Sequence, residues 1–239
     1  MKKAIFCWSG GKDSAYALYK VIMEKEFEVV SLLTTVNSDF GRITMHGIKE
    51  SLLDEQVNAI GLPLKKMYIS DGTYQEYEAE MEKSLLEFKK EGVEHVIFGD
   101  IFLEDLRKYR EDNLKKVEMK AVFPLWGMNT QDQIQHFIED GFKTKICCVN
   151  DSLLNENHVG VDLSHEFLDS IPSQVDPCGE NGEFHTFCYG GPIFKENLKV
   201  KISEKVYKPL EVPSDKKCQL PDIPPTKGFW YADVELTKN

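Results

Sequence analysis

Short apolar runs alternate with longer amphipathic segments along the first half of the chain. The runs predict buried strands, and apolar residues that recur at intervals of three and four predict helices. Gly61 and Gly92 follow two of these segments, as helix ends prefer. The expected strands and helices are, in order, 4–8, 15–20, 28–36, 48–60, 64–69, 74–90, 93–98 and 103–120.

Strands and helices that alternate without hairpin signals predict a parallel, doubly wound α/β sheet with helices on both faces. The alternation ends at residues 121–126, where Pro124 and the following Gly127 mark a domain boundary. After residue 128, the sequence pattern predicts a mixture of helices and strands at 130–141, 143–150, 164–170, 198–206 and 228–236. The sequence therefore predicts two domains, 1–128 and 129–239, of which the second is a smaller α+β unit.

The junction between the first strand and the first helix reads SGGKDS. Its glycines let backbone N–H groups approach an oxyanion, and the helix N-terminus adds partial positive charge. Its serines can donate hydroxyl hydrogen bonds, its lysine supplies a point charge, and its aspartate suits a metal ion or a helix cap. The predicted phosphate-binding residues are Ser9, Gly10, Gly11, Lys12, Asp13 and Ser14.

Two other phosphate-binding loops do not fit this junction. A Walker A loop needs glycine where Phe6 stands and serine or threonine where Asp13 stands. A dinucleotide fingerprint needs glycine in place of Lys12.

Further candidates follow other strand ends. Segments 9–14, 35–37 and Gly99-Asp100 each come after a predicted strand, so we expect them to share one crevice of the sheet. Arg107 and Arg110 lie three residues apart on one predicted helix. They either reach a phosphate together or form part of a solvated face.

A second polar motif, CGENGEFHTF, spans residues 178–187. It has three interpretations: a structural glycine turn, a metal site, or a substrate-binding corner. The metal site would use Cys178, His185 and Cys188, although this spacing matches no standard zinc pattern. The substrate-binding corner would place Glu180, Glu183 and His185 beside the nucleotide as acid–base groups.

Composition narrows the class of protein. The net charge of −11, from 40 acidic and 29 basic residues, argues against tight binding to bulk nucleic acid. The sequence shows no signal peptide and no apolar run of membrane-spanning length, so a cytoplasmic location is expected. None of the six cysteines forms a CxxC pair, which argues against a zinc ribbon or a redox dithiol.

Taken together, the motifs resemble one family. SGGKDS, Gly99-Asp100 with Arg107, Arg110 and Glu111, the segment PLWG at 124–127, and CGENGEFHTF recur in this order in the diphthine–ammonia ligases. These are N-type ATP pyrophosphatases of the HUP class with a PP-loop. The resemblance implies that ATP adenylates the carboxylate of diphthine on translation elongation factor 2. Pyrophosphate would leave, and ammonia would then displace AMP.

The resemblance also implies roles for the candidate residues. Lys12 and Asp13, with Mg²⁺ on Asp13, would act in catalysis together with Glu180, Glu183 and His185. The ATP-binding residues would be segment 9–14 together with Gly99, Asp100, Arg107 and Arg110.

Some alternatives stay open. Segment 36–48 is more like that of bacterial relatives, for which the acceptor carboxylate would be a different one. A tRNA-modifying PP-loop enzyme and a non-catalytic nucleotide-binding module are the competing classes. The oligomeric state is undetermined, with a homo-oligomer among the possibilities.

Overall fold

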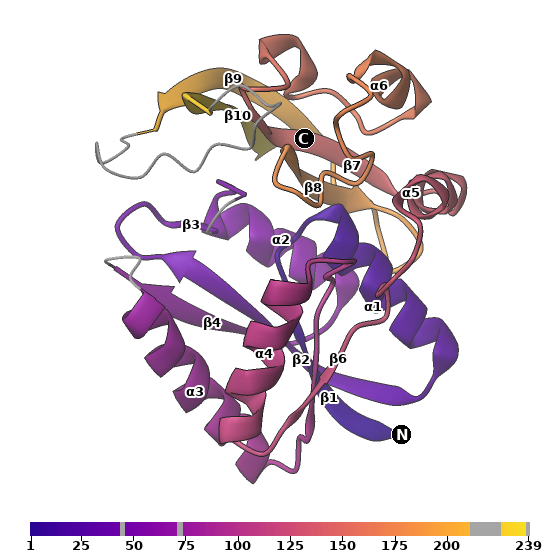
Figure 1. Cartoon of the computed structure of the whole chain (residues 1–239). Helices are drawn as coiled ribbons and strands as arrows, with labels where there is room; N and C mark the ends of the chain where they lie inside the picture. The colour runs from indigo at the N-terminus through magenta and orange to yellow at the C-terminus, as the bar shows by residue number, and fades with distance from the viewer. Residues whose placement is uncertain (44–45, 71–73, 211–225, 238–239) are drawn as a thin grey trace.

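The computed structural model describes residues 1–43, 46–70, 74–210 and 226–237 and arranges them around two β-sheets (Figure 1). The first sheet, sheet A, has the order β3-β2-β1-β5-β6, with β4 also paired to β2. All of its pairings are parallel except the short hairpin between β2 and β3. Its strands are β1 (Lys2–Cys7), β2 (Phe27–Asn37), β3 (Arg42–Ile43), β4 (Leu64–Ile69), β5 (His95–Ile97) and β6 (Lys120–Val122).

Helices cover both faces of sheet A, which confirms the predicted α/β class (Figure 1). Successive strand residues point to opposite faces, so Ile5 and Phe6 of β1 enter different apolar cores. The core around Ile5 includes residues of α3 (Tyr74–Lys90) and α4 (Glu104–Lys116). The core around Phe6 includes residues of α1 (Lys12–Glu24) and α2 (Glu50–Ile60), which are drawn in Figure 1 on the other side of the sheet.

The second sheet, sheet B, is antiparallel and has the order β8-β7-β10-β9. It lies beyond the carboxyl end of β1, above sheet A in Figure 1. The apolar core around Phe6 continues into it and includes Phe187, so the packing crosses the predicted boundary at residue 128. The division into domains 1–128 and 129–239 stays a prediction. The elements of this part are α5 (Thr130–Glu139), β7 (Lys143–Asn150), the 3₁₀ helix η1 (Glu156–His158), α6 (His165–Ser170), β8 (Phe184–Gly190), β9 (Val200–Pro209) and β10 (Gly228–Leu236).

Two element predictions need correction. The helix expected over 103–120 ends at Lys116 because Glu118 adopts a left-handed φ of 54°, and the short strand β6 follows. The second half of the 178–187 motif is the start of β8 rather than part of a turn. By contrast, α2 ends at Ile60 as predicted, since Gly61 takes a φ of 84°.

In the described ranges, no helix combines the length and the apolar character needed to cross a membrane.

Gln56 of α2 is fully buried and joins the two sheets by hydrogen bonds. Its Oε1 accepts from the indole N–H of Trp8 at 2.9 Å, and its Nε2 donates to the carbonyl oxygens of Gly10 and Cys188. Cys188 belongs to β8, whereas Trp8 and Gly10 follow β1. One amide side chain therefore fixes the end of β1 against sheet B.

We expect Gln56→Leu to lower the free energy of unfolding by roughly 3 kcal/mol, because it leaves a buried donor and two buried acceptors without this partner. Urea unfolding followed by circular dichroism measures the change. Gln131→Leu, at an exposed position of α5, is the control and should change stability little. Equal stability of the two variants would contradict the structural role of Gln56.

Candidate active site

The loop after β1 has a conformation that requires its glycines. Gly10 adopts a φ of 81°, which side chains other than glycine rarely allow. Gly11 is extended and serves as the N-cap of α1, but a Cβ atom there would lie 2.7 Å from Cε1 of His46. Within the loop, the Ser14 hydroxyl donates to the carbonyl of Gly11, and the N–H of Gly11 donates to Oγ of Ser9. The loop is therefore tightly turned and closely covered.

Strand β8 brings the 178–187 motif directly onto this loop. The N–H of Lys12 donates to Oγ1 of Thr186 at 2.9 Å, and the N–H of Cys188 donates to the carbonyl of Gly10 at 2.9 Å. Hydrogen bonds thus join two segments that are separated by more than 160 positions in the sequence. Both motifs face one cavity.

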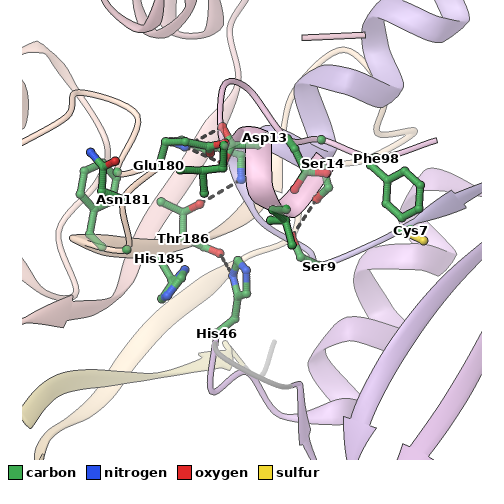
Figure 2. A pocket seen from close by; sticks show the side chains of 18 of the residues that line it. Cys7, Ser9, Asp13, Ser14, His46, Phe98, Glu180, Asn181, His185 and Thr186 are labelled. Carbon is green, nitrogen blue, oxygen red and sulfur yellow. Dashed lines mark hydrogen bonds and ion pairs between the residues drawn. The ribbon is translucent and has the colours of Figure 1, made fainter. Parts of the chain in front are cut away.

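This cavity has a volume of about 520 Å³ and lies between the loop, the end of β5 and the 178–187 motif (Figure 2). It contains most of the residues that the sequence singles out, although segment 35–37 is not among them. Its lining consists of Cys7, Ser9, Lys12, Asp13, Ser14, His46, Phe98, Gly99, Asp100, Leu103, Leu106, Arg110, Gly179, Glu180, Asn181, Gly182, Phe184, His185 and Thr186.

Lys12 provides a buried positive charge on the cavity wall. It is only 3% exposed, and its Nζ lies 2.6 Å from both carboxylate oxygens of Asp13. Burial lowers the pKa of Lys12, but the charge of Asp13 and other neighbours raise it more, and the net pKa lies above its usual value. Gln133 of α5, also buried, points its Nε2 at Oδ1 of Asp13 from 3.4 Å. The ammonium group therefore stays charged at neutral pH.

The end of β5 adds a second ion pair. The guanidinium of Arg110 lies 2.8 Å from Asp100 and over the ring of Phe98, and all three residues line the cavity. Gly99 allows this strand end to approach α1, because a Cβ atom there would lie 3.1 Å from backbone atoms of Asp13 and Ser14.

Arg107 does not join Arg110 at the cavity, contrary to the shared-phosphate expectation. Its guanidinium lies over Trp126, 4.5 Å from the ring centroid, and its Nε is 2.8 Å from Glu111. The aromatic stacking and the i, i+4 ion pair direct this side chain elsewhere on α4.

The two glutamates of the motif differ in position. Glu180 lines the cavity, and its Oε1 accepts from the N–H of Ile101 at 2.8 Å. Burial raises the pKa of Glu180 to about 7, although the hydrogen bond from Ile101 lowers it in part. Glu183 is 4% exposed, does not line the cavity, and accepts hydrogen bonds from Asp176 N–H and Asn181 Nδ2. Glu183 therefore shapes the turn that presents Glu180.

His185 lies in the cavity wall, and His46 joins it from the loop after β3 (Figure 2). The two ring centroids are 4.9 Å apart. Burial lowers the pKa of His185 to about 3, and charge interactions with His46, when that ring is protonated, and with Lys12 act in the same direction. Burial also lowers the pKa of His46. Both rings are therefore neutral at physiological pH, and His185 is too weak a base for the expected role of proton acceptor near pH 7.

His46, Gln56 and Gln133 were not found by sequence reasoning. Each lies in a segment with an ordinary helical or loop pattern, and no local spacing marks it. Only the packing of distant segments brings them to the loop.

The zinc interpretation of the motif finds no support in the described part of the chain. Cys178 Sγ donates to the carbonyl of Thr130, and Cys188 Sγ donates to that of Gly190. No cluster of three or more histidine, cysteine, aspartate or glutamate side chains in those ranges has a metal-binding arrangement. Magnesium needs fewer protein ligands than zinc, because one or two carboxylates together with substrate phosphates can hold it. The cavity-lining carboxylate of Asp13 fits that requirement.

Comparison with known proteins gives independent evidence on the family of this chain. The family model for the diphthamide synthase N-terminal domain matches residues 1–121, and that for the diphthamide synthase C-terminal domain matches residues 129–212. The diphthine–ammonia ligase of Mus musculus is 29% identical, with 83% of this chain and 82% of that protein covered. The enzyme of the same name from Homo sapiens is 28% identical over the same shares.

Among solved structures, a predicted subunit of tRNA methyltransferase from Methanocaldococcus jannaschii aligns with a TM-score of 0.42 and 16% identity. That alignment covers 80% of this chain and 98% of the other.

Proposed function

Because this chain belongs to the diphthamide synthase family, we propose that it is an ATP-dependent ligase that adenylates a diphthine-like carboxylate and couples it to ammonia. The names of its relatives support a ligase function in diphthamide biosynthesis. The observation that carries the proposal is the shared cavity, in which the glycine loop at the N-terminus of α1 faces Glu180, whose pKa burial raises to about 7. The acceptor is diphthine on elongation factor 2 or a chemically similar carboxylate.

The glycine loop binds the phosphates in this proposal. Ser9, Ser14 and Lys12 line the cavity at the N-terminus of α1, where hydroxyl groups, a buried cation and the helix dipole favour anions. Arg110 supplies a second cation at the other wall. Asp13 would hold Mg²⁺, which would neutralise charge on the phosphate oxygens when bound.

The reaction proceeds in two displacements. An oxygen of the acceptor carboxylate attacks the α-phosphorus, and pyrophosphate leaves with the electrons of the broken P–O bond. The nitrogen of ammonia then attacks the acyl carbon, and AMP leaves as the C–O bond breaks. Glu180, whose raised pKa of about 7 suits a general base near neutral pH, takes the proton that the new amide nitrogen loses.

In this proposal, each of the two predicted domains has its own role. Residues 1–128 would bind and activate ATP, while residues 129–239 would bind the acceptor and supply Glu180. The tRNA-modifying enzyme and the non-catalytic module remain the rival classes. The tRNA-modifying enzyme would require tRNA for turnover of ATP, and the non-catalytic module would bind ATP without turnover.

We expect the protein to convert ATP to AMP and pyrophosphate when ammonium and diphthine-bearing elongation factor 2 are both present. The loop is of the type associated with attack at the α-phosphorus, so ADP should not accumulate. Anion-exchange chromatography of the nucleotides tests this. Reactions without ammonium and with Ser9→Ala/Asp13→Ala protein are the controls. ADP as the main product, or turnover that depends on tRNA instead, would contradict the proposal.

A further inference from the structure

His46 has a hydrogen-bonding state that its contacts determine. Its Nδ1 lies 2.9 Å from the carbonyl oxygen of Thr186, and a carbonyl oxygen can only accept. Nδ1 therefore carries the proton. Because the ring is neutral, its Nε2 keeps a lone pair and can only accept a hydrogen bond.

The histidine pair lies beside the glycine loop that follows β1. The ring of His46 covers Gly11 so closely that a Cβ atom there would meet its Cε1 at 2.7 Å. His185 is adjacent to Thr186, whose Oγ1 binds the N–H of Lys12. Figure 2 shows both rings on one side of Thr186, with Asp13 and Glu180 on the other. A group bound by these rings would share the cavity with Lys12, Asp13 and Glu180.

Described residues on both sides of His46 are held in place by contacts outside the cavity. Arg42 and Lys49, which flank this histidine, both bind the carboxylate of Asp233 on β10, at 3.0 and 2.7 Å. Gly47 packs on the ring of Tyr231, where a Cβ atom would approach to 2.9 Å. Such outer contacts fix a side chain in one geometry before a ligand arrives.

We propose that His46 and His185 form the ammonia-binding subsite of this cavity, an inference that rests on the proposed ligase reaction. In its neutral ring, Nε2 of His46 offers an acceptor for an N–H of ammonia, while the single ring proton stays on Nδ1 and is donated to the carbonyl of Thr186. Beyond burial, the charge of Lys12 lowers the pKa of both rings, whereas the charge of Asp13 raises that of His46; the positive charge therefore favours neutral ammonia over ammonium on the His185 side of the pair. Placing ammonia here also brings the nucleophile close to the adenylated carboxylate.

Two substitutions at His46 separate this role from a structural one. His46→Asn keeps a donor for the carbonyl of Thr186 but loses the acceptor at Nε2, and should raise the KM for ammonium about tenfold with little change in the KM for ATP. His46→Gln places its amide near the Nε2 position and should retain most of the ammonium affinity. If His46 only supports Thr186, His46→Gln should have a higher KM for ammonium than His46→Asn. That result would overturn the proposal.

A binding measurement makes the test independent of turnover. In protein labelled with a nitrogen isotope at histidine, we expect the Nε2 resonance of His46 to shift saturably with ammonium chloride but not with tetramethylammonium chloride. His165, exposed on α6, is the internal control. A saturable shift without amide formation would overturn the proposed reaction but support the subsite. Absence of the shift, or a protonated Nε2, would overturn the subsite itself.

Discussion

Glu180→Gln is expected to slow amide formation about 10²-fold or more while leaving the affinity for ATP nearly unchanged. The substitution removes the carboxylate that accepts the proton but keeps an oxygen to accept from the N–H of Ile101. The shape of the loop should therefore survive. Single-turnover measurement of amide formation, with calorimetry of ATP binding on the same protein, gives both quantities.

The pH profile provides the sharper criterion for Glu180. A base must be deprotonated, so wild-type activity should rise with pH through about 7, the raised pKa of this group. That rise should disappear in Glu180→Gln. Glu183→Gln is the matched control, because Glu183 lies outside the cavity wall and should change the melting temperature rather than the pH profile. A normal rate and an unchanged profile in Glu180→Gln would exclude it as the base.

Lys12→Met is expected to lower the rate of AMP formation by roughly 10²- to 10³-fold, the scale for loss of one preorganised group that stabilises charge in a transition state. The ammonium group of Lys12 is buried, remains charged and lies at the N-terminus of α1, where charge on the phosphates would develop. Methionine keeps most of the side-chain volume, so the fold should persist. Quenched-flow measurement of AMP release at saturating ATP tests the rate.

Lys108→Met removes the same kind of charge at an exposed position of α4 that does not line the cavity, and should leave the rate unchanged. Melting temperatures of both variants separate a catalytic loss from unfolding. If Lys12→Met retained full activity while folded, the loop would have no electrostatic role in the reaction.

The sequence alone predicted strands β1, β2, β4 and β5 of the first sheet and the glycine loop after β1, because these depend on local information, whereas the short strands β3 and β6 were missed. The apolar run of β1, the glycines that follow it and the periodicity of α1 and α2 lie within about 60 residues, and each pattern has a direct conformational cause. The resemblance carried by the 178–187 motif likewise led to the family that the comparisons support.

Only the tertiary structure decided which of the motif's groups reach the cavity. Glu180 and Glu183 are alike in composition and three residues apart, yet one lines the cavity and the other is buried under Asp176 and Asn181. Their difference arises from the turn that precedes β8, which has no readable period in the sequence.

The protonation states of the site also came from packing rather than from residue type. His185 is the obvious base by composition, but burial beside His46 and Lys12 lowers its pKa, while burial raises that of Glu180. Desolvation depends on what distant segments cover each group, and no local pattern encodes that cover. The sequence therefore identified most of the candidate site residues, and the contact between β8 and the glycine loop determined how they are arranged.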